Sequence, residues 1–368
     1  MEAPIETKVL AKQPPFKTEG TEQRIQVPVL DIALDDDNKP NLLHENGRLR
    51  VAVDVGADGL NVTSPFPSPT PVPLDVDLVA KSHPDVKELD GLVPPGSQCS
   101  FTPTEAPSTH VNLDGSKKSK DVDPNGIIFD RDDRTLFQDT KYPWRTVGKV
   151  RTAGGWGSGA MIGSRLVLTA SSIINWNSDG RGNVGWVTFT PGYYDGRGPW
   201  GEFAASKVVY YEKVSGNLTD LETAFDYVIL VLAQPIGNTI GYVGAQLYQS
   251  PWNNLPSWQC VGYGQDRARG ERPLYQGGAI ISSVQPFTLN GNSGYVLGHF
   301  NDFTPGEGGA PAWGYFKDDP SRPRVVGVGS TIGSTAVERP TGSTNRDNEY
   351  AGGPALNKLI LEARANYP

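Results

Sequence analysis

Histidine, cysteine and clustered carboxylate side chains most often bind metals or carry acid–base chemistry, and this sequence spaces few of them for either purpose. Its four histidines, His44, His83, His110 and His299, are scattered, with no His-Glu-x-x-His pattern and no paired Cys-x-x-Cys. The glycine-rich run 154–159 leads into strand-like rather than helical sequence, so it is not typical of a dinucleotide site. We therefore expect no metal and no cofactor.

Two cysteines and two glycosylation sequons bear on the compartment in which the chain works. Asn61 and Asn217 each begin an Asn-x-Thr sequon, which is compatible with a secreted glycoprotein. The residues after Met1 do not form a signal peptide, so we expect a secreted chain whose signal was replaced by a start methionine. A disulfide between Cys99 and Cys260 is then expected; the alternative is an intracellular protein with two buried free thiols.

The composition favours a loop-rich β protein. The chain has 368 residues, of which 37% are hydrophobic and 20% charged, and it contains 43 Gly and 31 Pro. It holds no apolar run long enough for a transmembrane helix, so we expect no membrane span. Its net charge of −8 argues against nucleic acid as a partner.

Charge and aromatic content divide the sequence near residue 125. Residues 1–125 contain 20 Asp and Glu against 12 Lys and Arg, and 16 of the 31 Pro. All eight Trp and all fourteen Tyr lie beyond residue 140, and a compact core needs such large side chains. We expect an acidic, Pro-rich segment over 1–125 and one globular domain over 126–368.

The leading segment itself shows some order. Residues 24–30 and 49–55 alternate like strands, and the prolines of 64–73 favour an extended linker. The charged stretch 116–125 is expected to be exposed. These patterns predict a few strands that add to a neighbouring surface, or else a mostly disordered leader.

From residue 142 onward, short strand-like runs recur every 8–12 residues, a spacing typical of all-β barrels and sandwiches. One helix is predicted at 354–364, with Leu356, Leu359, Ile360 and Ala363 on one face. The strand-like runs are 160–163, 166–170, 184–189, 207–211, 226–232, 259–263, 278–284 and 324–329.

Four of these stretches resemble motifs of the chymotrypsin-like serine proteases. Residues 156–172, Trp-Gly-Ser-Gly-Ala-Met-Ile-Gly-Ser-Arg-Leu-Val-Leu-Thr-Ala-Ser-Ser, resemble the region of the catalytic histidine. Residues 225–232 resemble the strand that carries the catalytic aspartate, and 302–311 resemble the nucleophile loop. Residues 325–330 are similar to the strand beside the specificity pocket. The resemblance implies two six-stranded β-barrels with a C-terminal helix.

The start of the globular region narrows the resemblance. Asp130-Arg-Asp-Asp-Arg-Thr, followed by Tyr142-Pro, looks most like the glutamyl-endopeptidase (V8-like) branch. The resemblance covers about 126–368, which implies a trypsin-like domain there. Residues 1–125 would then stand where this branch carries a propeptide.

The catalytic residues of the family carry over at only one of three positions. Asp226 matches the aspartate, but Ser172 stands in the position of the histidine and Gly308 in that of the serine. Glycine has no side chain to attack a carbonyl, and a serine hydroxyl cannot act as a general base near neutral pH. We expect Asp226 to be a buried carboxylate satisfied by Ser172 and backbone donors. His299 could approach the cleft, cap a strand or lie at the surface.

The nucleophile loop implies an oxyanion-hole-like backbone at Gly306, Glu307 and Gly308. In the chymotrypsin branch the carboxylate before the nucleophile pairs with an amine released by cleavage. Ile127 would supply that amine if the chain were cut after Gly126; the alternative is an exposed loop glutamate at Glu307.

A specificity pocket is implied at Asp302, Gly327, Gly329 and Ser330. An acidic Asp302 in this pocket would favour basic side chains, but V8-like chains also carry an aspartate here as part of a turn. The pocket strand lacks the histidine of V8-like enzymes, which leaves glutamate selectivity open.

These observations leave three hypotheses for the function. The first is a pseudoprotease that binds a protein partner, such as a protease, a protease inhibitor or a host surface protein. The second is a serine-type endopeptidase with an atypical site acting on a protein substrate. The third is an adhesive or structural role centred on residues 1–125.

Overall fold

The structure is a computed structural model, and it describes residues 2–22, 41–45, 48–52, 75–78, 86–106, 127–129, 132–182, 184–338 and 344–368. For 41–45, 48–52, 75–78, 332–338 and 344–346 the description covers the backbone pairing. Contacts divide the chain into two units, residues 25–70 and the remainder. Within 25–70, β2 (Asn41–Glu45) and β3 (Arg48–Ala52) form an antiparallel hairpin. β3 overlaps the predicted strand 49–55 at residues 49–52, whereas the predicted strand 24–30 lies outside the described residues.

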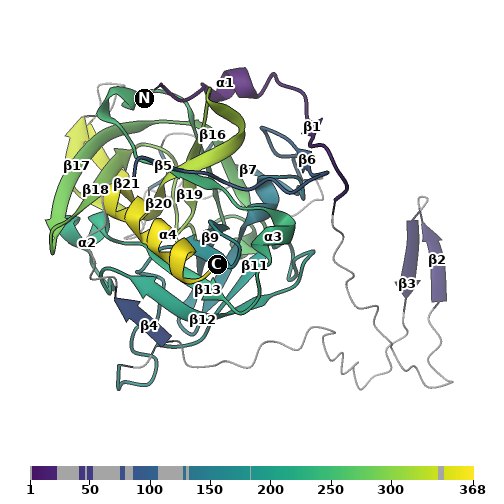
Figure 1. The fold of residues 1–368 in the computed structure, drawn as a ribbon, viewed down its shortest axis with the longest axis horizontal. Coiled ribbons are helices and arrows are strands. Elements are labelled where there is room, and N and C mark those ends of the chain that lie inside the picture. Colours follow the sequence, from purple (N-terminus) through teal and green to yellow (C-terminus); the bar gives the residue numbers. More distant parts are fainter. Residues whose placement is uncertain are drawn as a thin grey trace. The chain divides into compact units, whose positions relative to one another are not determined.

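The first large sheet closes into a barrel of six strands (Figure 1). Its order is β11-β8-β9-β10-β13-β12, and the pairing of β11 with β12 completes the ring. The predicted alternation explains the closure, because inward side chains such as Val150, Val167 and Leu230 share one buried cluster. The strands are β8 (Val147–Thr152), β9 (Gly155–Met161), β10 (Leu166–Thr169), β11 (Val187–Pro191), β12 (Phe203–Tyr210) and β13 (Val228–Leu232).

The second large sheet has the order β17-β18-β21-β20-β19-β15-β16-β7. β16 pairs with β15, and β17 pairs with β18, although only Ile280 separates β16 from β17. The continuous stretch of β16 and β17 therefore pairs with β15 through its first half and with β18 through its second half. The strands are β7 (Thr135–Leu136), β15 (Trp258–Gly262), β16 (Leu274–Ala279), β17 (Ile281–Leu289), β18 (Asn292–His299), β19 (Pro311–Phe316), β20 (Asp319–Glu338) and β21 (Thr344–Gly352).

The predicted C-terminal helix is present as α4 (Pro354–Asn366). Its predicted face, Leu356, Leu359, Ile360 and Ala363, is fully buried, and α4 contacts β18 and β13, strands of different sheets. The helix therefore packs against both sheets. Shorter helical elements are α1 (Thr7–Leu10), α2 (Asp220–Ala224), α3 (Gly237–Ile240), η1 (Trp144–Thr146), η2 (Ser250–Trp252) and η3 (Ala268–Gly270).

The leading segment adds strands to both sheets, which agrees with one of its two predicted alternatives, but the added strands lie outside the predicted runs 24–30 and 49–55. β4 (Asp75–Leu78) runs parallel to β12 of the barrel, and β5 (Glu88–Leu89) pairs with β14 (Gly244–Gln246). β1 (Phe16–Lys17) and β6 (Gln98–Cys99) pair with each other. The expected linker 64–73 and the expected exposed stretch 116–125 lie outside the described residues.

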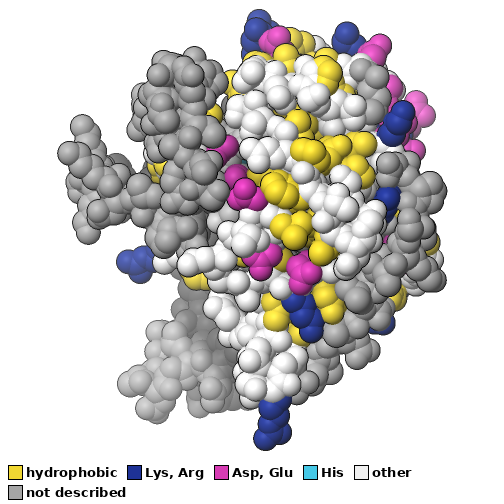
Figure 2. All heavy atoms as spheres, turned by 90° about the vertical axis from the view of Figure 1, so that its left-hand side faces the viewer, with side chains coloured by type: hydrophobic (Ala, Val, Ile, Leu, Met, Phe, Trp, Pro, Cys, Tyr) yellow, Lys and Arg dark blue, Asp and Glu magenta, His cyan; other side chains and the backbone are white. Residues whose placement is uncertain are grey.

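The surface is mostly polar, with apolar groups only partly exposed. On the side where β17 lies in Figure 1, hydrophobic side chains form a band with acidic side chains beside it (Figure 2). Among the described residues, only Val9 and Leu221 are large hydrophobic side chains classed as exposed. No helix in the described ranges is long and apolar enough to cross a membrane.

The expected disulfide between Cys99 and Cys260 is absent, and both thiols are free. The Cys99 thiol donates to the carbonyl of Ser97, whereas the Cys260 sulfur lies 2.8 Å from the hydroxyl oxygen of Tyr350. Each sulfur thus has its own buried partner. Burial raises the pKa of Cys99 to about 11 and that of Cys260 to about 12, which keeps both in the unreactive thiol form.

Both cysteines should therefore react with iodoacetamide in denaturant without any reductant. In the native chain we expect the reaction to be at least about tenfold slower, because burial withholds the thiolate. Intact-mass spectrometry counts the adducts. Alkylation in denaturant that requires prior reduction would show that the two sulfurs are bonded.

Candidate functional site

A cleft of about 450 Å³ collects the motif residues of the barrel and of the second sheet. Gly154 comes from the β8–β9 turn and Gly155 and Trp156 from the start of β9, Ser172–Asn175 follow β10, and Ser330 lies on β20. The loop before β19 supplies the opposite wall. The lining residues are Gly154, Gly155, Trp156, Ser172, Ile173, Ile174, Asn175, Gly216, Phe303, Pro305, Gly306, Gly308 and Ser330.

Asp226, just before β13, is fully buried next to this cleft and accepts three hydrogen bonds. The backbone N–H of Ser172 donates to Oδ1 at 2.7 Å, and the Ser172 hydroxyl donates to Oδ2 at 2.8 Å. The Ser330 hydroxyl also donates to Oδ2, at 2.6 Å. Burial raises the pKa of Asp226, and these hydrogen bonds oppose the rise. The expected satisfaction by Ser172 is confirmed, and the bond from Ser330 is an addition.

Position 308, where the motif resemblance predicts a nucleophile, lies open. A side chain built on Gly308 would meet, within 4 Å, only the Cγ2 methyl of Ile173, at 3.1 Å. No histidine lines the cleft among the described residues. The described lining therefore offers the hydroxyls of Ser172 and Ser330, with the Asp226 carboxylate buried beside them, but neither an imidazole nor a side chain at 308.

His299 lies inside the protein, at the end of β18, rather than at the surface. Its ring stacks on Tyr350 with 3.6 Å between centroids, and its Nδ1 accepts the N–H of Asn301. Burial lowers the pKa of His299 to about 3, so the imidazole is neutral. It is not among the residues that line the cleft.

The loop of residues 304–309 is fixed to strand β9 below it. Ser158 donates its N–H to the carbonyl of Gly308 and its hydroxyl to the carbonyl of Gly306, each at 2.8 Å. Gly306 has a φ of +94°, and a Cβ there would lie 2.4 Å from the carbonyl oxygen of Tyr263, so only glycine fits. Within the described residues, the N–H groups of Gly306 and Gly308 have no acceptor. Two amide donors are therefore free beside the cleft.

Glu307 is buried, so the expectation of an exposed loop glutamate was wrong, whereas its pairing with an amine at Ile127 requires cleavage after Gly126 and stays a prediction. Its Oε2 accepts Arg134 Nη1 at 2.6 Å and the N–H of Thr304 at 2.8 Å. The N–H of Ile127 donates instead to Asn348 Oδ1 at 3.0 Å. Burial raises the pKa of Glu307, and the guanidinium of Arg134 opposes that rise.

Arg134 is the centre of a buried ion cluster. Besides Glu307, its guanidinium binds the carboxylates of Asp132 and Asp266. These acidic groups surround a cation of the chain itself. Among the described residues, no group of three or more His, Cys, Asp and Glu side chains is arranged to hold a metal ion.

The residues of the expected specificity pocket have separate surroundings. Asp302 accepts the N–H of Phe129 at 2.8 Å and that of Asp133 at 3.1 Å, and it does not line the cleft. Gly329 packs against Phe303, since a Cβ on Gly329 would lie 2.4 Å from that ring. Gly327 packs away from the cleft, and Ser330 alone of the four lines it. The role of these residues in specificity stays a prediction.

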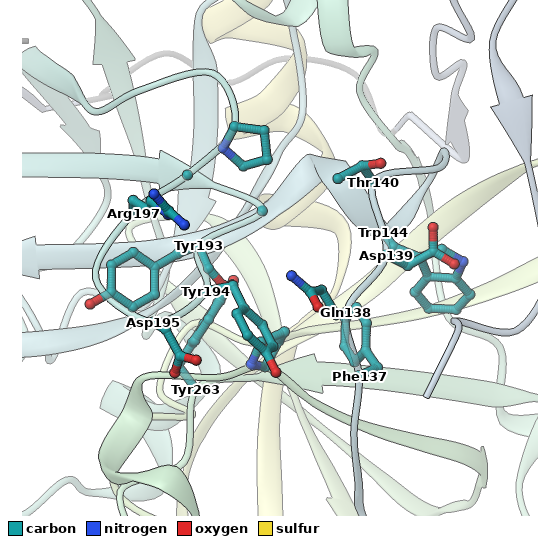
Figure 3. Close-up of a pocket in the computed structure, with 14 residues that line it drawn as sticks. Phe137, Gln138, Asp139, Thr140, Trp144, Tyr193, Tyr194, Asp195, Arg197 and Tyr263 are labelled. Atoms are coloured by element: carbon teal, nitrogen blue, oxygen red, sulfur yellow. The ribbon is translucent and has the colours of Figure 1, made fainter. Parts of the chain in front are cut away.

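A second pocket, of about 270 Å³, lies away from the cleft (Figure 3). Residues 193–197 lie on one side of it and 137–144 on the other. Its two carboxylates already have partners: Asp195 pairs with Arg272, and Asp139 with Lys141. It therefore offers aromatic walls but no unpaired carboxylate.

Sequence reasoning missed Arg134, Asp266 and Phe303. Arg134 lies in the quoted Asp130-Arg-Asp-Asp-Arg-Thr run, a visible signal of charge pairing. Its main partner is 173 positions away, so the spacing gave no indication of the contact.

No family model matches the chain. A sequence comparison finds the glutamyl endopeptidase of Bacillus licheniformis, 27% identical over 256 residues, which covers 68% of this chain and 72% of that protein. Over about two thirds of its length the chain is therefore similar in sequence to a glutamyl endopeptidase.

Solved structures with similarity include a Glu endopeptidase in complex with MPD, at 17% identity and a TM-score of 0.48 over 65% of this chain and all of that chain. The thermostable serine protease AL20 from an extremophilic microorganism has 18% identity and a TM-score of 0.42, over 60% of this chain and 98% of that one. The protease Anisep from Arthrobacter nicotinovorans has 19% identity and a TM-score of 0.41, over 61% and 98%.

The buried Asp302 predicts a specific pH dependence of stability. Burial raises the pKa of Asp302 from 3.8 to about 7, so the fold favours its protonated form. The contribution of Asp302 to the free energy of unfolding is complete below about pH 4 and is lost as the pH rises to about 7. The difference in unfolding free energy between the wild type and Asp302→Asn should therefore fall over that range. Urea unfolding at several pH values measures it, and a constant difference would contradict the assignment.

Proposed function

We propose that this chain is a secreted serine protease homologue whose cleft binds polypeptide without cleaving it. The observation that carries the proposal is the closed set of hydrogen bonds around Asp226. The Ser172 hydroxyl donates to this carboxylate, and a serine hydroxyl cannot take up a proton near neutral pH. No side chain at Gly308 could attack a bound carbonyl.

The cleft keeps the features that hold an extended peptide. Trp156, Ile173 and Phe303 supply apolar walls, and the free N–H groups of Gly306 and Gly308 can donate to a carbonyl oxygen. Such donors bind a peptide carbonyl even where no chemistry follows. A protein partner, such as a protease, a protease inhibitor or a host surface protein, therefore suits this site better than a small molecule.

We also infer that the second sheet is a second six-stranded barrel. The support is the stretch β16–β17, which pairs with β15 at one end and with β18 at the other across Ile280. Counted as one strand, it closes the ring with β15, β19, β20, β21 and β18.

We keep residues 126–368 as the protease-like domain and 1–125 as a prodomain-like segment. This segment is extensively bonded to the domain: Arg145 binds Glu22, and the Trp144 ring N–H donates to Ser100. Such buried contacts favour a segment that stays attached. The exposed Asn217 in its sequon supports secretion, and Asn61 lies outside the described residues.

Restoring the two missing side chains should create a protease. We expect Ser172→His with Gly308→Ser to cleave fluorescein-labelled casein. The parent, immobilised on a resin, should bind the casein without cutting it. The gain in hydrolysis should be at least about 10³-fold, because nucleophile and base act as a unit. Adding Ile173→Ala relieves the 3.1 Å contact at position 308.

Two controls make this test specific. Ser172→His with Gly154→Ser places the same two side chains in the cleft, but with the serine on another loop, and should stay inactive. Asn175→Trp fills the cleft and should abolish retention of casein, whereas Asn238→Trp on α3, outside the cleft, should not.

The alternatives predict other outcomes. Hydrolysis by the purified parent that Asp226→Ala abolishes would mean an endopeptidase with an atypical site. Retention of casein by the Asn175→Trp variant would contradict binding in the cleft and favour residues 1–125. A folded revertant that stays silent, with or without Ile173→Ala, would contradict a protease-like cleft.

A further inference from the structure

The carboxylate of Glu307 lies at the base of the cleft loop and is almost completely buried, with 5% of the residue exposed. A carboxylate this deep is costly unless a cation and several donors surround it. Arg134 Nη1 supplies the cation at 2.6 Å, and Thr304 donates its N–H at 2.8 Å, while the Thr304 hydroxyl donates to Asp266 Oδ1 at 2.7 Å. The ion pair therefore holds the Glu307 side chain in place, between the two glycines whose N–H groups are free.

The same guanidinium connects three separate stretches of chain. Nη1 also donates to the Thr304 hydroxyl at 3.0 Å, while Nε and Nη2 bind Asp132 and Nη2 binds Asp266. Arg134 is itself only 2% exposed. The planar guanidinium has five donors in a fixed arrangement, which suits it to hold several loops at once. Removing it would leave Glu307 buried without a counter-cation.

The backbone around Ile127 is bonded as an ordinary internal peptide. Its N–H donates to Asn348 Oδ1, and its carbonyl accepts Asn348 Nδ2 at 2.8 Å and the N–H of Phe303 at 3.2 Å. Ile127 is buried, at 8% exposure. None of these bonds needs a free amine at Ile127.

We propose that Arg134 is a built-in counter-cation that holds the 304–309 loop, and with it the cleft, in its formed conformation in the uncut chain. Cleavage between Gly126 and Ile127 would release an amine, but the carboxylate of Glu307 already has its cation. The cleft is then constitutively formed rather than switched on by processing. This inference concerns the loop and stands whether or not the cleft binds polypeptide.

Hydrogen exchange over residues 303–309, read by mass spectrometry on the full chain, tests the proposal. Arg134→Met should raise the exchange rate there roughly tenfold or more, because the loop opens when its anchor is lost. Glu307→Gln should change it little, and the double variant should recover much of the loss, since no buried charge is then left unpaired. Arg151→Met, which removes a surface arginine paired with Glu202, is the matched control and should leave the loop unchanged.

Cutting the chain completes the experiment. A recognition sequence for a specific protease, ending at residue 126, lets Ile127 become an N-terminus, and exchange over 303–309 should be the same before and after the cut. Greater protection after the cut would overturn the proposal, as would an unchanged loop in Arg134→Met. The proposal would also be overturned if Arg134→Met raised the exchange rate equally in the parent and in the Glu307→Gln variant. If Arg134→Met alone fails to fold, folding of the double variant is itself the expected rescue.

Discussion

A buried carboxylate connects the two halves of this protein, and the form of the cleft depends on it. Asp226 precedes a barrel strand, and its donors come from both halves: Ser172 from the barrel and Ser330 from the second sheet. Desolvation of a carboxylate is unfavourable, so three donors at 2.6–2.8 Å must stay in place for the charge to stay buried. The two hydroxyls are thereby committed to structure.

A second buried carboxylate, Glu307, is compensated in another way. It pairs with the guanidinium of Arg134, whose charge persists at any ordinary pH. Glu307 lies in the same loop as the free N–H groups of Gly306 and Gly308, and Ser158 holds this loop through two hydrogen bonds to its carbonyls. The buried carboxylates and their partners thus hold the residues around the cleft in place without any nucleophile or general base at its centre.

The sequence predicted the features that depend on neighbouring residues and missed those that depend on distant ones. The strands of the barrel and the buried face of α4 follow from local alternation, which is readable directly. The family motifs predict Ser172 beside Asp226. They place Ser330 in a specificity pocket, because the hydrogen bond from Ser330 to Asp226 depends on how the two sheets pack and not on neighbouring residues. The pairing of Arg134 with Glu307 spans 173 residues, and the separate partners of Cys99 and Cys260 depend on packing. None of these contacts is encoded in spacing.

The central claim is that the cleft contains no activated nucleophile, and a fluorophosphonate probe tests it most directly. Such a probe bonds covalently to a serine whose hydroxyl is made nucleophilic by a neighbouring base. Treatment of the native parent chain, followed by intact-mass spectrometry, should show no adduct. Stoichiometric labelling of Ser172 or Ser330 in the native chain would contradict the account, if a chain that is denatured before treatment is not labelled.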